Sequence, residues 1–173
     1  SEWAPYLFVH EFGHHFAGLA DEYYTSSVEY LAPEVITEPY EPNVTALLDP
    51  ENLKWKHHVA PNTPLPTPWP KEAFEEHSLA YQEIRQQMRA DNVPEADMNK
   101  LFRDNQAFAE KLFDESGQKA VVGAFEGGNY QAEGYYRPAQ NCLMFTRTEA
   151  FCAVCAEAIG KVIDEYTLTE PAE

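Results

Sequence analysis

The stretch HEFGHHFAGLADE, residues 10–22, decides how the rest of the chain is interpreted. Residues 4–18 have the character of a helix, in which His10 and His14 lie about 40° apart around the axis and about 6 Å apart along it. Both imidazoles can therefore reach one ion on the same side of the helix. Glu11, beside His10, can lean over that ion and contact a bound water. This H-E-x-x-H pattern is typical of two zinc ligands and a general base.

The expected ends of this helix leave room for a third ligand. Pro5 suits the first turn, and Gly18 suits the residue after the last turn, where a left-handed conformation costs little. A continuous helix would carry Asp21 about 16 Å along the axis from His10, which is too far to share an ion. The chain must therefore reverse at Gly18. Asp21, or Glu22 in its place, can then complete a catalytic zinc site with one open position.

These residues predict hydrolysis by a water that Zn²⁺ activates. The ion lowers the pKa of its water and polarises a carbonyl, while Glu11 takes the proton and passes it to the leaving amine. Donors for the oxyanion are sought in the sequence GYYRP, which offers Tyr135, Tyr136 and Arg137. The alternative is a helix whose polar face happens to carry histidines. His15 is expected to pack or to face solvent. Nothing in the spacing favours His57, His58 or His77 as a distal ligand, so these are expected to be plain surface residues.

The composition is that of one globular domain with a strong negative charge. The chain has 173 residues, of which 44% are hydrophobic and 24% are charged, and its formal net charge is −17. This charge disfavours nucleic acid and anionic membranes as partners, because phosphate binding requires Lys and Arg. No apolar run is long enough to span a bilayer, so we expect no membrane insertion.

Three cysteines lie close together near the C-terminus: Cys142, Cys152 and Cys155. We favour one disulfide plus one free thiol, which suits an exported protein and leaves Cys142 paired with either of the other two. The alternative is a reduced CAVC pair with a metal or redox role. Three thiols are one ligand short of a structural zinc site.

The segment after the predicted helix and metal loop of residues 1–32 is rich in proline. Residues 33–70 predict an irregular arm, because dense prolines forbid long helices and central strands. Trp55 and Trp69 are expected to hold this arm against the domain. The sequence NVT at 43–45 also fits a glycosylation sequon.

The remainder of the chain predicts further helices and a little strand. Residues 71–118 have helical periodicity and predict a helical hairpin. Residues 119–173 predict a short strand, a Gly-rich loop and a turn, followed over 147–166 by an amphipathic helix. The elements together predict an α+β domain that is mainly helical.

The motifs also resemble those of a known group of enzymes. HEFGHHFAGLADEYY, followed far downstream by NCLMF, resembles the metzincin zinc peptidases. With GAFEGGNY, GYYRP and FCAVC added, the two ends of the chain are similar to the immunoglobulin A peptidase family of bacterial zinc metalloendopeptidases. The resemblance implies a zincin-like (metzincin) catalytic domain. Its implied site has the zinc ligands His10, His14 and Asp21, the base Glu11, and Met144 in a methionine turn as an apolar floor beneath the metal.

The chain departs from the usual metzincin pattern in two places. Ala17 stands where the glycine is expected, and the third ligand comes one residue late at Asp21, so the turn must absorb an extra residue. Thr146 stands where some metzincins have a tyrosine after the turn methionine. Any help from a tyrosine must therefore come from elsewhere.

The resemblance further implies a substrate, a location and a missing part. Metzincin domains place a sheet before the active-site helix, and its edge strand holds the substrate. We expect this sheet, and a further N-terminal domain, to belong to the full-length protein. The implied function is a secreted, cell-surface or periplasmic bacterial zinc endopeptidase that cleaves a host glycoprotein, immunoglobulin A. The alternatives are another protein substrate, or a non-catalytic zinc-binding module that recognises a glycoprotein.

Overall fold

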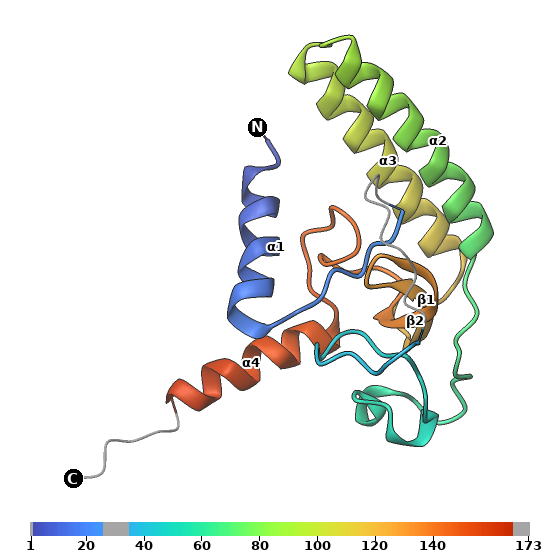
Figure 1. The fold of residues 1–173 in the computed structure, drawn as a ribbon, viewed down its shortest axis with the longest axis vertical. Coiled ribbons are helices and arrows are strands. Elements are labelled where there is room, and N and C mark those ends of the chain that lie inside the picture. The colour runs from blue at the N-terminus through green and yellow to red at the C-terminus, as the bar shows by residue number, and fades with distance from the viewer. Residues whose placement is uncertain (1, 26–34, 168–173) are drawn as a thin grey trace.

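The computed structural model describes residues 2–25 and 35–167. In chain order its elements are α1 (Ala4–Ala17), η1 (Pro50–Asn52), η2 (Lys56–His58), α2 (Lys71–Ala90), α3 (Glu95–Glu115), β1 (Val122–Gly128), β2 (Gln131–Ala139) and α4 (Ala153–Thr167). Figure 1 shows the small sheet between α1 and α4 on one side and the long pair α2 and α3 on the other. The prediction of an α+β fold is confirmed, with four α-helices and one two-stranded sheet among the described residues.

Helix α1 ends where the sequence predicts. Gly18 adopts a left-handed conformation with φ 60° and ψ 33°. Its N–H donates to the carbonyl of His14 (3.1 Å), and the next N–H, of Leu19, donates to the carbonyl of Gly13 (3.3 Å). Two such bonds close a helix end and release the chain in a new direction. One face of α1 packs against α4.

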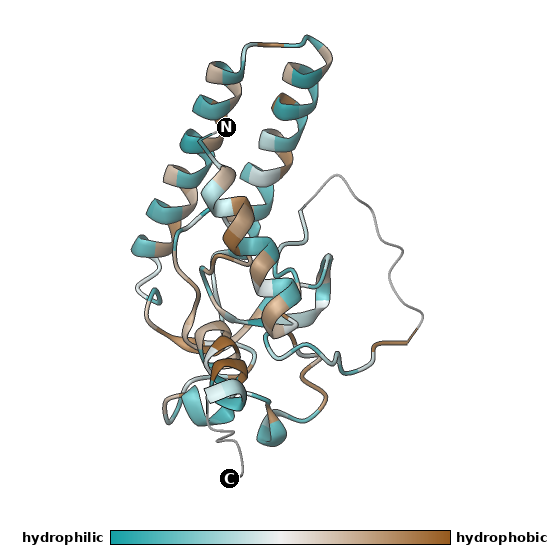
Figure 2. Cartoon of the chain, turned by 90° about the vertical axis from the view of Figure 1, so that its left-hand side faces the viewer, coloured by the Kyte–Doolittle hydropathy of each residue, from teal (hydrophilic) through white to brown (hydrophobic). Residues whose placement is uncertain are grey.

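The opposite face of α1 is apolar and exposed. Figure 2 views the molecule from the side of α1, which carries several hydrophobic residues along its length. The exposed fractions are 54% for Leu7, 73% for Phe8 and 41% for Phe12. In contrast, α2 and α3 are coloured mainly hydrophilic.

The predicted helical hairpin is confirmed by α2 and α3. Pro94 precedes α3 at its N-cap, one position before the first turn in which it was expected. Only one end of the hairpin enters the core, where the rings of Phe74 and Phe113 stack with centroids 5.8 Å apart. Figure 1 shows the other end extending away from the rest of the molecule.

The strands β1 and β2 form an antiparallel hairpin, pairing Val122 with Ala139 and Gly128 with Gln131. The prediction of one strand followed by a Gly-rich loop was therefore incomplete, because the loop is largely the second strand. Gly134, with φ 79°, interrupts the alternation that would have marked it.

The proline-rich arm is held by its two tryptophans as expected. The indole N–H of Trp55 donates to the carbonyl of Gly123 (2.7 Å), and that of Trp69 donates to the carbonyl of Glu126 (3.1 Å). Both acceptors lie in β1. The described part of the arm, 35–70, is irregular apart from η1, η2 and an isolated bridge between Thr45 and β2.

The main core lies where α1, α4, the base of the hairpin and the loop at 142–146 meet. Its fully buried members include Cys142, Leu143 and Met144. Helix α4 begins at Ala153 and not at residue 147 as predicted. The backbone before Ala153 is not helical. Its carbonyl at Ala150 instead accepts a hydrogen bond from the N–H of Leu143 (2.8 Å).

Candidate metal centre

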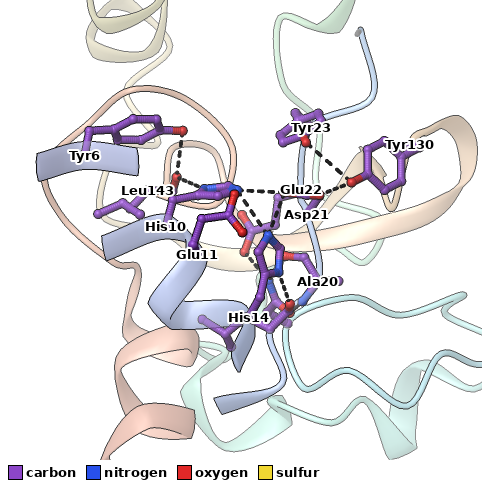
Figure 3. Close-up of polar contacts among 12 residues, drawn as sticks. Tyr6, His10, Glu11, His14, Ala20, Asp21, Glu22, Tyr23, Tyr130 and Leu143 are labelled. Atoms are coloured by element: carbon purple, nitrogen blue, oxygen red, sulfur yellow. Dashed lines mark hydrogen bonds and ion pairs between the residues drawn. The ribbon is translucent and has the colours of Figure 1, made fainter. Parts of the chain in front are cut away.

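Three side chains predicted as ligands converge at the inner face of α1 (Figure 3). Nε2 of His10 lies 2.9 Å from Oδ1 of Asp21, and Nε2 of His14 lies 3.2 Å from the same oxygen. The two Nε2 atoms are 3.2 Å apart. His10 and Asp21 are buried, and His14 is partly exposed. The structure therefore brings the three atoms into a compact triangle that opens on the His14 side.

The other ring nitrogens of the two histidines are held by backbone carbonyls. Nδ1 of His10 lies 3.2 Å from the carbonyl oxygen of Leu143, and Nδ1 of His14 lies 2.6 Å from that of Leu19. A carbonyl oxygen can only accept, so each Nδ1 carries the proton. Each Nε2 then keeps its lone pair for a metal ion.

Asp21 is positioned by the hairpin turn between the strands. The hydroxyl of Tyr130 donates to Oδ2 of Asp21, and the N–H of Asn129 donates to the Asp21 carbonyl (2.9 Å). Burial opposes ionisation of this carboxyl, but the contact with His10 and the hydrogen bond from Tyr130 outweigh it and lower the pKa of Asp21. Burial and the bond to Asp21 raise the pKa of Tyr130, which keeps its hydroxyl protonated as a donor. Tyr130 was not among the predicted site residues.

The loop that carries Asp21 is clamped by a buried asparagine. The side chain of Asn43 accepts from the N–H of Ala20 (2.8 Å) and donates to the Ala20 carbonyl (3.0 Å). The turn between α1 and Asp21 contains one residue more than the usual metzincin spacing. This longer turn is thus held at one end by the helix cap at Gly18 and at the other by Asn43. Asn43 is fully buried, so its sequon does not present an accessible glycosylation site.

Glu22, the alternative third ligand, is directed elsewhere. Its Oε1 accepts from the side chain of Asn43 (3.0 Å) and from the thiol of Cys155 (3.3 Å). The side chain is fully buried, and this desolvation raises the pKa of Glu22 to about 8. Asp21, and not Glu22, lies with the two histidines.

Glu11 is exposed beside the ligand triangle. Together with His10 it lines a groove that runs between α1 and the hairpin, here named the α1–α2 groove. Other lining residues include Tyr6, Tyr23 and Arg85. Glu11 is thus exposed to solvent where the groove passes His10.

Met144 lies beneath the ligand helix. A Cβ atom placed on Gly13 would be 3.1 Å from the Met144 sulfur, so the glycine between the two histidines allows this close approach. The N–H of Phe145 donates to the carbonyl of Cys142 (2.8 Å), which makes the segment a tight turn. Met144 is fully buried and forms an apolar support for α1.

The family of the chain is shown by its sequence. The family described as IgA Peptidase M64 matches residues 1–163. The chain belongs to this family. Its members are metallopeptidases, so this M64 peptidase is a hydrolase with a protein substrate. No curated protein is significantly similar to it.

The residues expected to stabilise an oxyanion in this M64 peptidase lie outside the ligand triangle. Tyr135 is buried in a separate apolar cluster with Ala20 and Val44. Tyr136 is half-buried and borders a hollow beside Trp69 and Lys71. Both belong to β2 and not to the Gly-rich loop that the sequence predicted.

Arg137 has a structural position in this M64 peptidase. Its guanidinium carbon lies 4.2 Å from the ring centre of Trp69 and 3.8 Å from that of Phe145, and one of its nitrogens donates to the carbonyls of Glu126 (3.0 Å) and Gly127 (2.9 Å). Burial lowers the pKa of Arg137 to about 10, so it stays cationic at neutral pH. Full burial removes it from any substrate.

The other histidines and the cysteines have separate locations. His57 and His58 both contact Glu157, with Nε2 to Oε2 distances of 2.8 and 2.6 Å, in a partly exposed group. His77 stacks on Phe108, with ring centroids 3.6 Å apart. Cys142, Cys152 and Cys155 are all free thiols, so the structure contains no disulfide among them, contrary to the prediction. Among the described residues, no helix is long and apolar enough to cross a membrane.

Proposed function

We propose that the protein is a zinc-dependent endopeptidase in which His10, His14 and Asp21 hold the metal and Glu11 is the general base. The observation that carries this proposal is the convergence of two imidazole nitrogens and one carboxylate oxygen on a single point. Two histidines and one carboxylate, with one position left open, form a donor set typical of catalytic zinc.

The spacing of the three ligand atoms fits zinc. A tetrahedral site with bonds of about 2.0 Å places its ligand atoms about 3.3 Å apart. The corresponding separations here are 2.9, 3.2 and 3.2 Å. Both histidines already have the tautomer that a metal requires, because their Nδ1 atoms are directed at carbonyls.

Bound zinc would lower the pKa of a water and polarise the carbonyl of the scissile bond. The chain's own contribution begins with Glu11, whose exposed carboxylate accepts a proton from the attacking water. The same carboxyl then donates that proton to the leaving amine. Tyr130 and the carbonyls of Leu19 and Leu143 keep the ligands oriented while this happens.

The α1–α2 groove supports an extended peptide as the substrate, because it passes both His10 and Glu11. We further propose a metzincin-like fold around α1 and the turn at Met144, and a secreted or cell-surface bacterial enzyme. The family description supports a host glycoprotein, and immunoglobulin A in particular, as the protein that is cleaved.

The proposal is tested by Glu11→Gln. This variant should bind zinc as the wild type does and lose hydrolysis of immunoglobulin A, because an amide cannot accept the proton. The matched control is Glu72→Gln, which changes an exposed glutamate in the first turn of α2 and should retain activity. Zinc content and cleavage in the presence and absence of a chelator are measured side by side.

The outcomes separate the parts of the proposal. Hydrolysis by Glu11→Gln at the wild-type rate would refute the role of Glu11. Cleavage that a chelator does not affect would refute the metal mechanism. A zinc-dependent peptidase that leaves immunoglobulin A intact but cleaves another glycoprotein would refute only the substrate.

A further inference from the structure

A second group of potential metal ligands lies in the core behind Asp21. It consists of Glu22 and the three thiols of Cys142, Cys152 and Cys155, here named the thiol–Glu22 cluster. One ligand atom from each residue lies within 4.8 Å of every other. The four residues come from the Asp21 loop, the turn before Met144 and the start of α4, so distant parts of the chain meet at this point.

The contacts in the cluster match a zinc site that is rich in sulfur. The sulfur atoms of Cys142 and Cys155 are 3.7 Å apart, and a tetrahedral site with zinc–sulfur bonds of about 2.3 Å places two sulfurs about 3.8 Å apart. The sulfur of Cys155 lies 3.3 Å from Oε1 of Glu22. Neither distance requires the chain to move far in order to bind an ion.

Burial gives the cluster a polar group with no partner. Glu22, Cys142 and Cys155 are fully buried. Oε2 of Glu22 has no hydrogen-bond partner among the residues that the structure describes. A buried carboxyl group in that position is costly unless a donor or a cation compensates it. A divalent cation among the four side chains would supply that compensation.

We propose that the thiol–Glu22 cluster binds a second zinc ion, separate from the one at His10, His14 and Asp21. Three thiolates and one carboxylate provide four protein ligands, which leave no position for water or substrate. A closed site of this kind has a structural role. The N–H of Cys152 donates to the sulfur of Cys142 (3.3 Å), which helps to stabilise a thiolate ligand. This inference does not depend on the proposed peptidase chemistry.

The position of the cluster indicates what structural role the second ion would have. Glu22 follows Asp21 directly, and its N–H donates to the carbonyl of Met144 (2.9 Å). An ion bound to Glu22 and the cysteines would therefore fasten the Asp21 loop to the methionine turn and to α4. Loss of this ion should loosen the loop and weaken zinc binding at the first site.

The test uses the metal content of the intact protein and its cobalt spectrum. The wild type should hold two zinc ions per chain. The double variant His10→Ala/His14→Ala should hold one, and its cobalt form should retain strong sulfur-to-cobalt charge-transfer absorption. Cys155→Ser should weaken that absorption, because one of the three thiolate ligands is removed. The control His57→Ala/His58→Ala, which removes the histidines of the partly exposed group, should retain two ions.

Two results would overturn the inference. Both are obtained with the wild-type protein, so neither requires a variant to fold. One is a wild-type cobalt form without sulfur charge transfer. The other is a Cys142 disulfide, found by mass spectrometry of the wild-type protein purified without oxidant. Failure of the peptidase proposal would appear differently, as loss of the first ion or of hydrolysis while the sulfur absorption remains.

Discussion

At the scale of single residues, the orientation of Asp21 depends on a tyrosine that is distant in the sequence. The hydroxyl of Tyr130 donates to one carboxylate oxygen, which leaves the other directed at the two histidines. Hydrogen bonds of this kind orient a ligand and tune its basicity. Tyr130 is therefore a positioning residue for the proposed metal site.

Tyr130→Phe should weaken zinc binding at the first site about 10- to 100-fold, because Asp21 loses its orienting donor. The measurement is the zinc dependence of hydrolysis in metal buffers. The control is Tyr136→Phe, which removes a hydroxyl from β2 outside the ligand triangle. An unchanged zinc dependence in Tyr130→Phe would contradict the assigned role.

Local spacing accounts for most of what could be predicted at this scale. The i and i+4 histidines, the reversal at Gly18 and a carboxylate soon after it all lie within one short stretch. Tyr130 lies 109 positions from Asp21, and nothing in the spacing connects them. Asn43 was missed for the same reason, since its sequon suggested an exposed loop when the side chain is buried.

At the scale of elements, the β1–β2 hairpin approaches the Asp21 loop through a glycine. Gly127 has φ 100°, and a Cβ atom there would overlap the ring of Tyr24. Tyr24 belongs to the segment that follows Asp21, so this contact fixes how closely the sheet can pack against the loop. Only glycine satisfies both the backbone conformation and the space.

Gly127→Ala should lower the free energy of unfolding by about 1–3 kcal/mol from backbone strain alone, with the overlap adding to the loss. Gly160→Ala is the matched control, since it lies in α4 and a Cβ there meets nothing within 4 Å. It should stabilise the protein by about 0.5–1 kcal/mol. Urea unfolding of both variants measures the difference, and equal stabilities would contradict the packing described.

The helices could be predicted more fully than the strands. The glycine at the end of α1 and the periodicity of α2 and α3 mark these helices, because such signals are local. The second strand was missed because Gly134 and Pro138 disturb its pattern, and its partner is needed to define it. The predicted start of the C-terminal helix at residue 147 was wrong, because the backbone at Ala150 forms a hydrogen bond with the turn at 142–146.

At the scale of the whole molecule, the two candidate metal sites share one scaffold. Asp21 contacts His10 and Glu22 contacts Cys155, so two consecutive residues of one loop belong to the two different sites. The motifs could predict the family, because they lie within short stretches of the chain. The meeting of the loop, the hairpin turn and α4 depends on long-range packing, which a single sequence does not specify.

The most direct test of the central claim is a crystal structure of the zinc-loaded protein with anomalous scattering collected at the zinc edge. The account predicts a peak about 2.0–2.2 Å from Nε2 of His10, Nε2 of His14 and Oδ1 of Asp21, with Glu11 beside it. The absence of zinc at this position in a protein that hydrolyses its substrate, or a different set of ligands, would contradict it.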